Sequence, residues 1–340
     1  MLLTLTITVL LTSISVLFII NKASSIGLIA VPNHRSSHLK VTPCGAGIGF
    51  VFAFLIGILS IGHSFYGEYI LSLVAITLVF FLGVYDDYNH SSSRTKFFVI
   101  LLASILIFLN GLKITSVGSY YGNPIEVSYL ALPLTVFAVV GFTNALNLLD
   151  GIDGLAALTS IIILAGLGMV GYQYDNPLVY KLSGVLIAAL GTFLLFNWNP
   201  AKIFMGDSGS LTLGFVIAVL SIEVTKYVDP VSILFITAIP ILDTVTVMVR
   251  RKLEGVSILT ADRNHVHHIV QRYLGGSVRQ SVILLASIQL CFTIFGVFVA
   301  PQYSQENTLP LFFFCLLIFY WGTEKMRAEY AKREANSSEK

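Results

Sequence analysis

Long apolar runs alternate with short polar breaks along nearly the whole chain. A helix that crosses the roughly 30 Å hydrocarbon core of a bilayer needs about 20 mostly apolar residues. The pattern predicts an all-α polytopic membrane protein with about 11 transmembrane helices. They cover approximately 2–20, 46–62, 69–85, 97–112, 129–146, 155–172, 182–196, 209–225, 231–249, 281–299 and 309–323. We expect one transmembrane domain over residues 1–323 and a charged tail over residues 324–340.

The composition excludes an ordinary soluble domain. Of the 340 residues, 56% are hydrophobic and 11% are charged, and the mean hydropathy is +0.84, whereas soluble domains carry about 25% charged residues. The lipid bilayer is the expected surrounding, and no nucleic acid partner is expected. Cys44, Cys291 and Cys315 lack metal-ligand spacing, which predicts neither a disulfide framework nor a zinc site.

Positive charges are distributed unequally between the two sides of the membrane. With an odd number of spans the termini lie on opposite faces, and the segments on the C-terminal side hold 17 of the 20 Lys and Arg residues. Only Lys113, Lys181 and Lys226 remain for the other side. By the positive-inside rule the C-terminus is cytoplasmic and the N-terminus is outside. Residues 113–128 are predicted to form an external hairpin or loop, and the tail a solvated helix end.

Charged residues follow the odd-numbered spans, where they are costly beside a membrane and often mark function. All odd-numbered spans end on the cytoplasmic side, so these groups can converge at one surface. The first group is Asp86 and Asp87, followed by Arg94 and Lys96. Two interpretations stay open: solvated caps at a helix end, or a carboxylate pair near a divalent cation with the basic residues meeting phosphate oxygens.

The second group lies in the segment NALNLLDGIDGLAA. Its polar residues recur every third position and would form a stripe on a continuous helix; they are Asn144, Asn147, Asp150 and Asp153. Gly151 and Gly154 would allow the helix to break, which would leave oxygen atoms for a hard cation or a nucleotide. A purely structural role in helix packing is the alternative.

The third group, FNWNPAKIFMGDSGSLTLG, places Asp207 directly before a predicted helix. Backbone N–H groups at a helix start attract anions, and a carboxylate there can hold Mg²⁺ that bridges the same phosphates. Phe204 could stack on a nucleotide base. A capping Asp207 and a packed Phe204 would be the structural alternative.

The fourth group, DRNHVHHIVQR, contains His265, His267 and His268 beside Arg263. Zinc is the rival explanation of three close histidines, but no cysteine or HExxH pattern accompanies them. Donors to a diphosphate or a sugar fit the basic surroundings better. A further loop places His38 on the cytoplasmic surface, and its spacing leaves open whether it contacts substrate.

These motifs together resemble one family. In chain order they read PN-x-R-SSH with TP-x-G, then DD, N-x-x-N-x-x-DG-x-DGLA, FMGD-x-GS and H-x-HH, from Pro32 to His268. The sequence resembles the polyprenyl-phosphate N-acetylhexosamine-1-phosphate transferases, which start O-antigen, teichoic acid and peptidoglycan lipid intermediates. The resemblance covers nearly the whole chain. Cys44 and Ala46 depart from it, because Arg and Gly are common there in the family.

The resemblance implies a role for individual residues. Asn147 and Asp207 would ligate Mg²⁺, with Mn²⁺ as the alternative. The remaining catalytic assignments are Asp86, Asp87, Asp150 and the three histidines of the loop that meets the diphosphate and the sugar, His265, His267 and His268. The substrate-binding assignments are Asn197, Phe204 and Asp153 at the uridine, Arg94 and Lys96 near the lipid phosphate, and Arg263 and His38 in the cytoplasmic loops.

The implied reaction is attack by a phosphate oxygen of undecaprenyl phosphate on the β-phosphorus of a UDP-N-acetylhexosamine, with UMP leaving. A phosphate monoester has a second pKa of about 6, whereas Asp titrates near 3.9, so an aspartate is a poor base for it. We therefore favour Asp86 and Asp87 as organisers of metal and cations, with Asp86 as a base the alternative. The expected setting is the bacterial inner membrane, with the site facing the cytoplasm, GlcNAc as the default sugar, an O-antigen type of pathway and a homodimer as an option.

Two other functions remain as alternatives. One is a peptidoglycan lipid I-type transferase, and the other, from a different class, is a membrane transporter. Transporters usually place their sites near the midplane and contain internal repeats, whereas these polar groups cluster at one surface. The DG-x-x-AR pattern of CDP-alcohol phosphotransferases is absent after Asp150.

Overall fold

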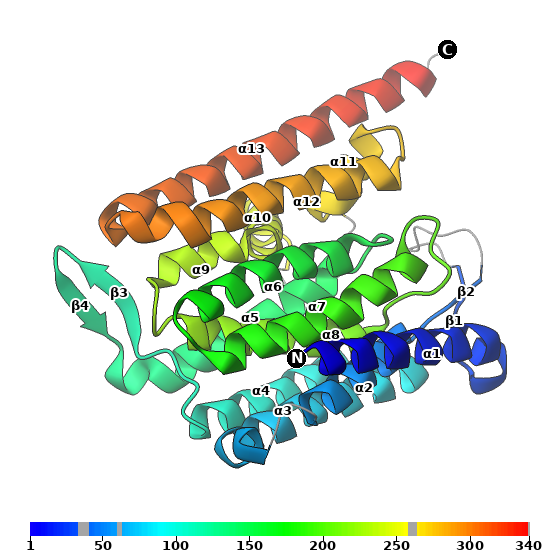
Figure 1. Ribbon diagram of the computed structural model, residues 1–340. Coiled ribbons are helices and arrows are strands. Elements are labelled where there is room, and N and C mark those ends of the chain that lie inside the picture. Colours follow the sequence, from blue (N-terminus) through cyan, green and yellow to red (C-terminus); the bar gives the residue numbers. More distant parts are fainter. Residues whose placement is uncertain (33–40, 60–62, 258–263, 339–340) are drawn as a thin grey trace.

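The computed structural model describes residues 1–32, 41–59, 63–257 and 264–338, and its elements are almost all helices (Figure 1). Ten of the predicted spans coincide with one helix each. These are α1 (Leu2–Ile26), α2 (Ala46–Leu59), α3 (His63–Asn89), α4 (Ser93–Leu109), α5 (Ala131–Leu149), α6 (Leu155–Gln173), α7 (Pro177–Asn197), α8 (Asp207–Val224), α12 (Val278–Ile294) and α13 (Gln305–Ser338). The predicted all-α polytopic fold is confirmed.

The number of membrane crossings is a separate question. Within the described residues, eight helices are long and apolar enough to cross a bilayer, or nine if one bent pair counts as a single span. Helix α2 is apolar but has only 14 residues. The count of eleven spans and their orientation therefore stay predictions.

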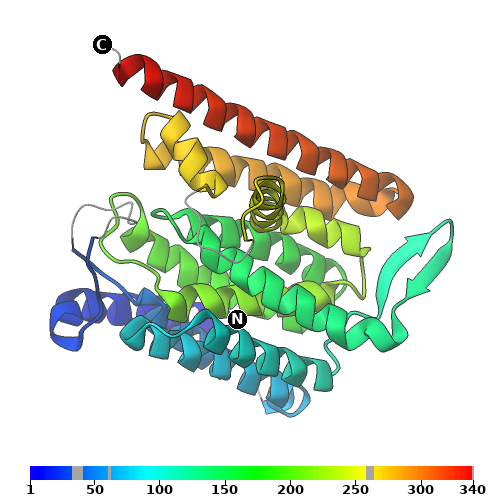
Figure 2. The same cartoon turned by 180° about the vertical axis from the view of Figure 1, so that it is seen from behind.

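Helix α8 lies in the centre of the bundle, and its residues from Ser208 to Val224 are all buried. It packs against α2, α3, α5 and α6. Helices α12 and α13 lie outside this group, at the top of Figure 1 and of the reverse view in Figure 2. The polar start of the buried helix, at Asp207, is thus surrounded by the ends of its neighbours.

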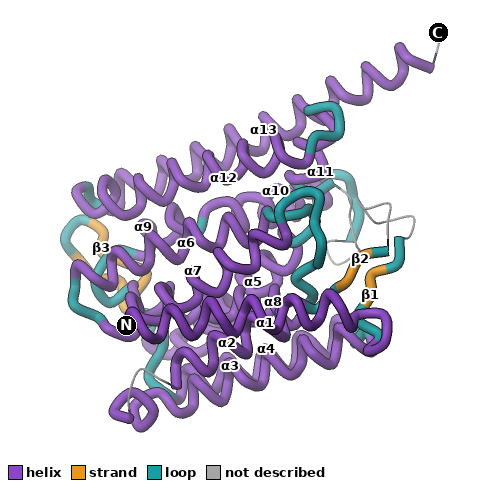
Figure 3. The backbone as a smooth tube through the Cα atoms, turned by 45° about the vertical axis from the view of Figure 1, so that its right-hand side comes forward, coloured by secondary structure: helices purple, strands orange, loops and turns teal. Residues whose placement is uncertain are grey.

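Two short antiparallel strand pairs mark the two ends of the bundle (Figure 3). At one end β3 (Ser116–Tyr120) pairs with β4 (Asn123–Glu126), which confirms the hairpin predicted within 113–128. At the other end β1 (Ile29–Ala30) pairs with β2 (Thr42–Pro43). The backbone N–H of Phe204 donates to the carbonyl of Pro43 at 2.9 Å, so the loop before α8 lies at this second end.

Glycines allow α2 and α3 to approach the start of α8 closely. A Cβ atom on Gly47 would lie 2.0 Å from the backbone nitrogen of Gly209, and one on Gly83 would lie 2.4 Å from the Cα of Ser208. Membrane helices commonly use small residues for such close packing. Because Gly83 packs against Ser208, the following residues of α3 are held beside the first turn of α8.

The predicted span over 231–249 is wrong as a single helix. It is divided into α9 (Pro230–Ile236) and α10 (Ala238–Leu253), which meet at an angle of 88°. Pro240 explains the break, because its ring would clash with the carbonyl of Ile236 in a continuous helix. Gln289 of α12 binds both sides of the break: its Nε2 donates to the carbonyl of Ile236 at 2.8 Å, and its Oε1 accepts the N–H of Ile239 at 2.9 Å.

The charged tail continues α13 without interruption and contacts the rest of the protein. Glu324 lies 2.6 Å from the Nε of Arg250 on α10, and Arg327 lies 3.0 Å from Glu254. The side chain of Arg250 is only 3% exposed. The predicted helix is confirmed, but this part of it is more than a solvated end, since it supplies the partner of a buried arginine.

Candidate active site

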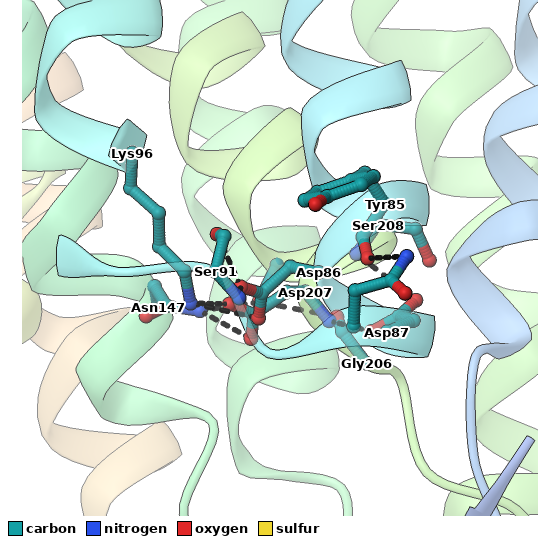
Figure 4. Close-up of polar contacts among 11 residues, drawn as sticks. Tyr85, Asp86, Asp87, Ser91, Lys96, Asn147, Gly206, Asp207 and Ser208 are labelled. Atoms are coloured by element: carbon teal, nitrogen blue, oxygen red, sulfur yellow. Dashed lines mark hydrogen bonds and ion pairs between the residues drawn. The ribbon is translucent and has the colours of Figure 1, made fainter. Parts of the chain in front are cut away.

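Lys96 joins the acidic end of α3 to the acidic start of α8 (Figure 4). Its Nζ lies 2.8 Å from Asp86 Oδ2 and also forms an ion pair with Asp207 Oδ2. The other oxygen of Asp86 accepts the backbone N–H of Ser91 at 2.7 Å and its hydroxyl at 2.5 Å. Two acidic residues that are 121 positions apart are therefore bridged by one lysine side chain.

Asp87 is used differently from its neighbour. Its Oδ1 accepts the backbone N–H of Asp207 at 2.6 Å, and its Oδ2 accepts that of Ser208 at 3.2 Å. These N–H groups have no intrahelical partner at a helix start, so Asp87 caps α8 from another helix. Gly206 precedes them with φ of 75° and lies against this carboxylate, where a Cβ atom would be 2.7 Å from Asp87 Oδ1.

Asn147 comes from the last turn of α5 to the same place. Its Nδ2 donates to Asp207 Oδ1 at 3.1 Å and to the hydroxyl of Ser210 at 2.8 Å. The structure thus brings together Asn147 and Asp207, the two residues that the family resemblance assigned to the metal. Asn144, one turn earlier, is exposed and does not share in these contacts.

The helix breaks where the glycines of the second motif allow it. Helix α5 ends at Leu149, α6 begins at Leu155, and Gly154 has φ of 80°. Asp150 lies in this turn; its backbone N–H donates to the carbonyl of Asn147 at 3.3 Å, whereas its carboxylate makes no hydrogen bond within the described residues. Its burial raises its pKa well above the usual value, and the negative charges of Asp207, Asp87 and Asp153 add to the effect.

A metal ion was expected among these acidic residues. Within the described part of the chain, no three His, Cys, Asp or Glu side chains are grouped so that they could hold a metal by themselves. Mg²⁺ commonly takes only one or two carboxylates together with substrate phosphates and water. The Asp150 carboxylate, which has no partner in the described part of the chain, fits a cation of this kind, because negative charges near one another, here those of Asp150, Asp207 and Asp87, disfavour the charged forms unless a cation is added.

The residues assigned to uridine hold the loop between α7 and α8. Asn197 is buried; its Oδ1 accepts the N–H of Gly154 at 2.9 Å, and its Nδ2 donates to the carbonyl of Ile203 at 2.9 Å. Asp153 Oδ2 accepts from Asn199 Nδ2 at 2.8 Å and from the N–H of Ala201 at 3.0 Å. Both residues connect this loop to the turn after α5, and their contact with a nucleotide stays a prediction, as does that of the half-buried Phe204.

The histidine segment, residues 265–268, lies against the turn between α5 and α6. A Cβ atom on Gly151 would lie 2.1 Å from His267 Nε2, so only a glycine permits this approach. His267 is buried, and neither of its ring nitrogens has a hydrogen-bond partner among the described residues. Burial, with smaller effects of His268 and His265, holds the pKa of His267 well below its usual value. A neutral, unpartnered imidazole is thus aimed at the turn that carries Asp150.

The rings of the three histidines form a row. The centroids of His265 and His267 are 5.9 Å apart with an interplanar angle of 12°, and those of His267 and His268 are 4.2 Å apart. His265 precedes α11 (Val266–Tyr273), a short helix that the apolar pattern did not predict. The start of α11 therefore fixes the position of the three rings.

Two side chains of α10 hold the start of the histidine segment. Asp243 Oδ2 lies 2.9 Å from His265 Nδ1, and Asp243 Oδ1 accepts the N–H of Val266 at 2.7 Å. Arg250 Nη1 donates to the carbonyl of Asn264 at 2.7 Å. Sequence reasoning missed Asp243, whose only signal was a carboxylate in an apolar run.

Three predicted site residues do not join these contacts. Arg94 is exposed at the start of α4 and forms no ion pair within the described residues. His38 and Arg263 lie outside the residues that the structure describes. Ser91 and Ser210, which bind Asp86 and Asn147, were not predicted, because hydroxyl residues at helix ends carry no distinctive spacing.

Known proteins resemble the chain over most of its length. Residues 69–225 match the family described as glycosyl transferase family 4. The "Probable undecaprenyl-phosphate N-acetylglucosaminyl 1-phosphate transferase" of Bacillus subtilis (strain 168) is 34% identical over 304 residues, which are 88% of this chain and 84% of the relative. An "Undecaprenyl-phosphate alpha-N-acetylglucosaminyl 1-phosphate transferase" is 33% identical in Yersinia pestis, with 91% and 87% covered, and 29% identical in Escherichia coli (strain K12), with 92% and 87% covered.

The matched region runs from within α3 to the end of α8 and contains Asp86, Asp87, Asn147 and Asp207. The matches to the relatives extend over about nine tenths of the chain. The chain belongs to the polyprenyl-phosphate N-acetylhexosamine-1-phosphate transferases of glycosyl transferase family 4.

Proposed function

We propose that the protein transfers N-acetylhexosamine 1-phosphate from a UDP-sugar to undecaprenyl phosphate. A phosphate oxygen of the lipid bonds to the β-phosphorus, the bond from that phosphorus to the bridging oxygen breaks, and UMP leaves with that oxygen. The observation that carries this proposal is the junction of Asp86, Lys96 and Asp207 in a chain whose relatives are named for this reaction. GlcNAc is the sugar in the names of those relatives and is our first choice for the donor.

Lys96 is suited to bind the phosphate of the acceptor lipid. It lies at the start of α4, and its ammonium group already holds two carboxylates. A phosphate monoester is mostly dianionic at pH 7, since its second pKa is about 6. It can compete for the ammonium group and needs no general base, which leaves Asp86 to orient Lys96.

The proposed metal site consists of Asp207 and Asn147, with Asp150 and Asp86 close to it. When bound, Mg²⁺ or Mn²⁺ would neutralise the diphosphate and the leaving UMP. The chain itself would position the reactants, which can supply a large part of the rate increase in phosphoryl transfer.

The row of three histidine rings is suited to bind the UDP-sugar donor. Among the residues that the structure describes, neither ring nitrogen of His267 has a hydrogen-bond partner, and the ring lies against Gly151, next to Asp150. A neutral imidazole can donate from one nitrogen and accept at the other. These contacts support a role for His267 in binding the diphosphate or the sugar.

The setting that we propose is a bacterial inner membrane with the site on the cytoplasmic side. The excess of Lys and Arg in the loops at the site end supports this orientation. The product would start a lipid-linked polysaccharide such as an O-antigen. A homodimer is a further element of the proposal, which cross-linking in native membranes would test.

The test is turnover by purified protein in nanodiscs with undecaprenyl phosphate and Mg²⁺. The donors are UDP-GlcNAc, UDP-GalNAc, 6-deoxy UDP-sugars and UDP-MurNAc-pentapeptide, and the products are UMP and the lipid diphosphate sugar. We expect UDP-GlcNAc to react, EDTA to stop the reaction, and Mg²⁺ or Mn²⁺ to restore it. Turnover with the pentapeptide donor alone would favour the peptidoglycan alternative.

Two aspartates provide a matched comparison. Asp207→Asn removes a carboxylate from the proposed metal site, and we expect turnover to fall by about 100-fold or more, since removal of one such electrostatic contact costs ~10²–10³ in rate. Asp229→Asn changes the residue before α9, at the far end of α8, and should leave turnover close to that of the wild type. The proposal fails if no donor yields UMP or labelled lipid.

A further inference from the structure

Asp243 is a buried carboxylate to which neither the sequence motifs nor the proposed reaction gives a role. It lies on α10, and its exposed fraction is 2%. A buried charge is costly unless hydrogen bonds compensate it. Both of its oxygens are used at the start of the histidine segment, at 2.9 Å from His265 Nδ1 and at 2.7 Å from the backbone nitrogen of Val266.

The contact determines which nitrogen of His265 carries hydrogen. A carboxylate can only accept a hydrogen bond, so Nδ1 donates its N–H to Asp243. Nε2 then accepts a hydrogen bond in the neutral ring, or donates one when the ring takes up a proton. Within the described residues Nε2 of His265 makes no hydrogen bond, which leaves it available to a ligand.

The orientation of His265 bears on the whole histidine row. Its ring is nearly parallel to that of His267, and His267 in turn lies against Gly151 beside Asp150. Arg250 holds the carbonyl of Asn264, the residue immediately before His265. Helix α10 therefore fixes two consecutive residues at the head of the row, one through its backbone and one through its ring.

We propose that Asp243 is a positioning residue for the transfer reaction. It holds His265 with Nδ1–H directed at α10 and with Nε2 directed at the diphosphate or sugar of the bound donor. The substrate in this inference rests on the proposed function, whereas the contact between Asp243 and His265 does not. Removal of a residue that orients a functional histidine through a hydrogen bond to its other ring nitrogen typically lowers activity by about 10–100-fold.

A purely structural role is the competing explanation, because Asp243 also caps the start of α11. Asp243→Asn separates the two roles. Its remaining carbonyl oxygen can still accept the N–H of Val266, but its amide N–H₂ then faces Nδ1 of His265. That nitrogen would have to accept, so the hydrogen of the neutral ring would move to Nε2.

The first test is a double-mutant cycle on turnover of UDP-GlcNAc with undecaprenyl phosphate. We expect Asp243→Asn to reduce kcat/KM by about 10–100-fold in the wild type and by less than about threefold in a His265→Ala background. Glu254→Gln removes an exposed carboxylate from the residue that follows the same helix and should leave turnover unchanged. Equal losses in both backgrounds would show that Asp243 acts independently of His265 and would overturn the inference.

The second test does not depend on turnover. Solid-state NMR of protein with ¹⁵N-labelled histidine distinguishes protonated from unprotonated ring nitrogens, and the His265→Ala spectrum identifies the signal among the seven histidines. We expect hydrogen on Nδ1 of His265 in the wild type and on Nε2 in Asp243→Asn. Hydrogen on Nε2 in the wild type would refute the inference, whereas absence of wild-type turnover would refute only the proposed function.

Discussion

The carboxylate of Asp87 accepts the backbone N–H of Asp207 at a distance of 2.6 Å, across 120 residues of sequence. Because of this bond, the two aspartates of the DD motif, Asp86 and Asp87, have different structural roles. Asp87 caps the central helix α8, whereas Asp86 holds Lys96. Removal of either residue should lower activity, but for different physical reasons, which stability measurements can separate.

Asp87→Ala should destabilise the protein as well as reduce its activity. The substitution leaves the first N–H groups of α8 without their acceptor, and loss of a helix cap costs about 0.5–2 kcal/mol. Thermal unfolding in detergent should show a lower midpoint than for the wild type. Asp87→Asn keeps one acceptor oxygen and should lose less stability. An unchanged midpoint for Asp87→Ala would mean that this cap does not stabilise α8.

Asp86→Asn tests whether this residue is a base. The substitution keeps an oxygen for Ser91 but removes the charge that pairs with Lys96. We expect turnover at pH 7 to fall by about 10–100-fold, as for loss of an interaction worth about 1.4–2.7 kcal/mol, with no recovery at pH 9. Strong recovery at pH 9 with unchanged Mg²⁺ affinity would instead indicate that Asp86 deprotonates the lipid phosphate.

Gly151→Ala should disrupt the site through a steric contact. The added methyl group would lie 2.1 Å from His267 Nε2, so the histidine segment must move. We expect a large loss of turnover, and a lower unfolding midpoint that is partly restored by combining Gly151→Ala with His267→Ala. Gly141→Ala on α5 is the matched control, because no atom lies within 4 Å of its added methyl group. Normal turnover of Gly151→Ala would place His267 away from this turn.

Much of this arrangement follows from the apolar pattern, and the rest depends on contacts that the pattern does not contain. Apolar runs predicted the helices, and the placement of Asp86 and Asp207 after odd-numbered spans predicted that they would lie at one surface. The pairing of Asn147 with Asp207 came from the family resemblance. The break before α10 was visible as Pro240 but lay inside an otherwise continuous apolar run. The contact of Asp243 with His265 joins ordinary residue types 22 positions apart, so only the fold reveals it.

The stability of the protein without nucleotide and metal should depend on pH through His267. Its pKa is lowered in the folded state, so below about pH 6.5 the unfolded chain takes up a proton there that the folded protein does not. Stability is therefore fully present above about pH 7 and decreases as the pH falls. The unfolding midpoint should drop less between pH 7.5 and 5.5 for His267→Gln than for the wild type. His90→Asn, which removes an exposed histidine, should behave as the wild type, and an equal drop for His267→Gln would contradict the assignment.

Glu324 shows how the charged end of α13 can affect the active site. It is the carboxylate partner of the buried Arg250, which also holds the backbone just before His265. Removing one partner of a buried ion pair costs about 3–5 kcal/mol, and we expect about 1–2 kcal/mol here because Glu324 is 27% exposed. Glu324→Ala should thus lower both the unfolding midpoint and turnover, whereas Glu329→Ala, on the same helix without such a partner among the described residues, should change neither. Equal behaviour of the two variants would mean that the tail does not support the histidine segment.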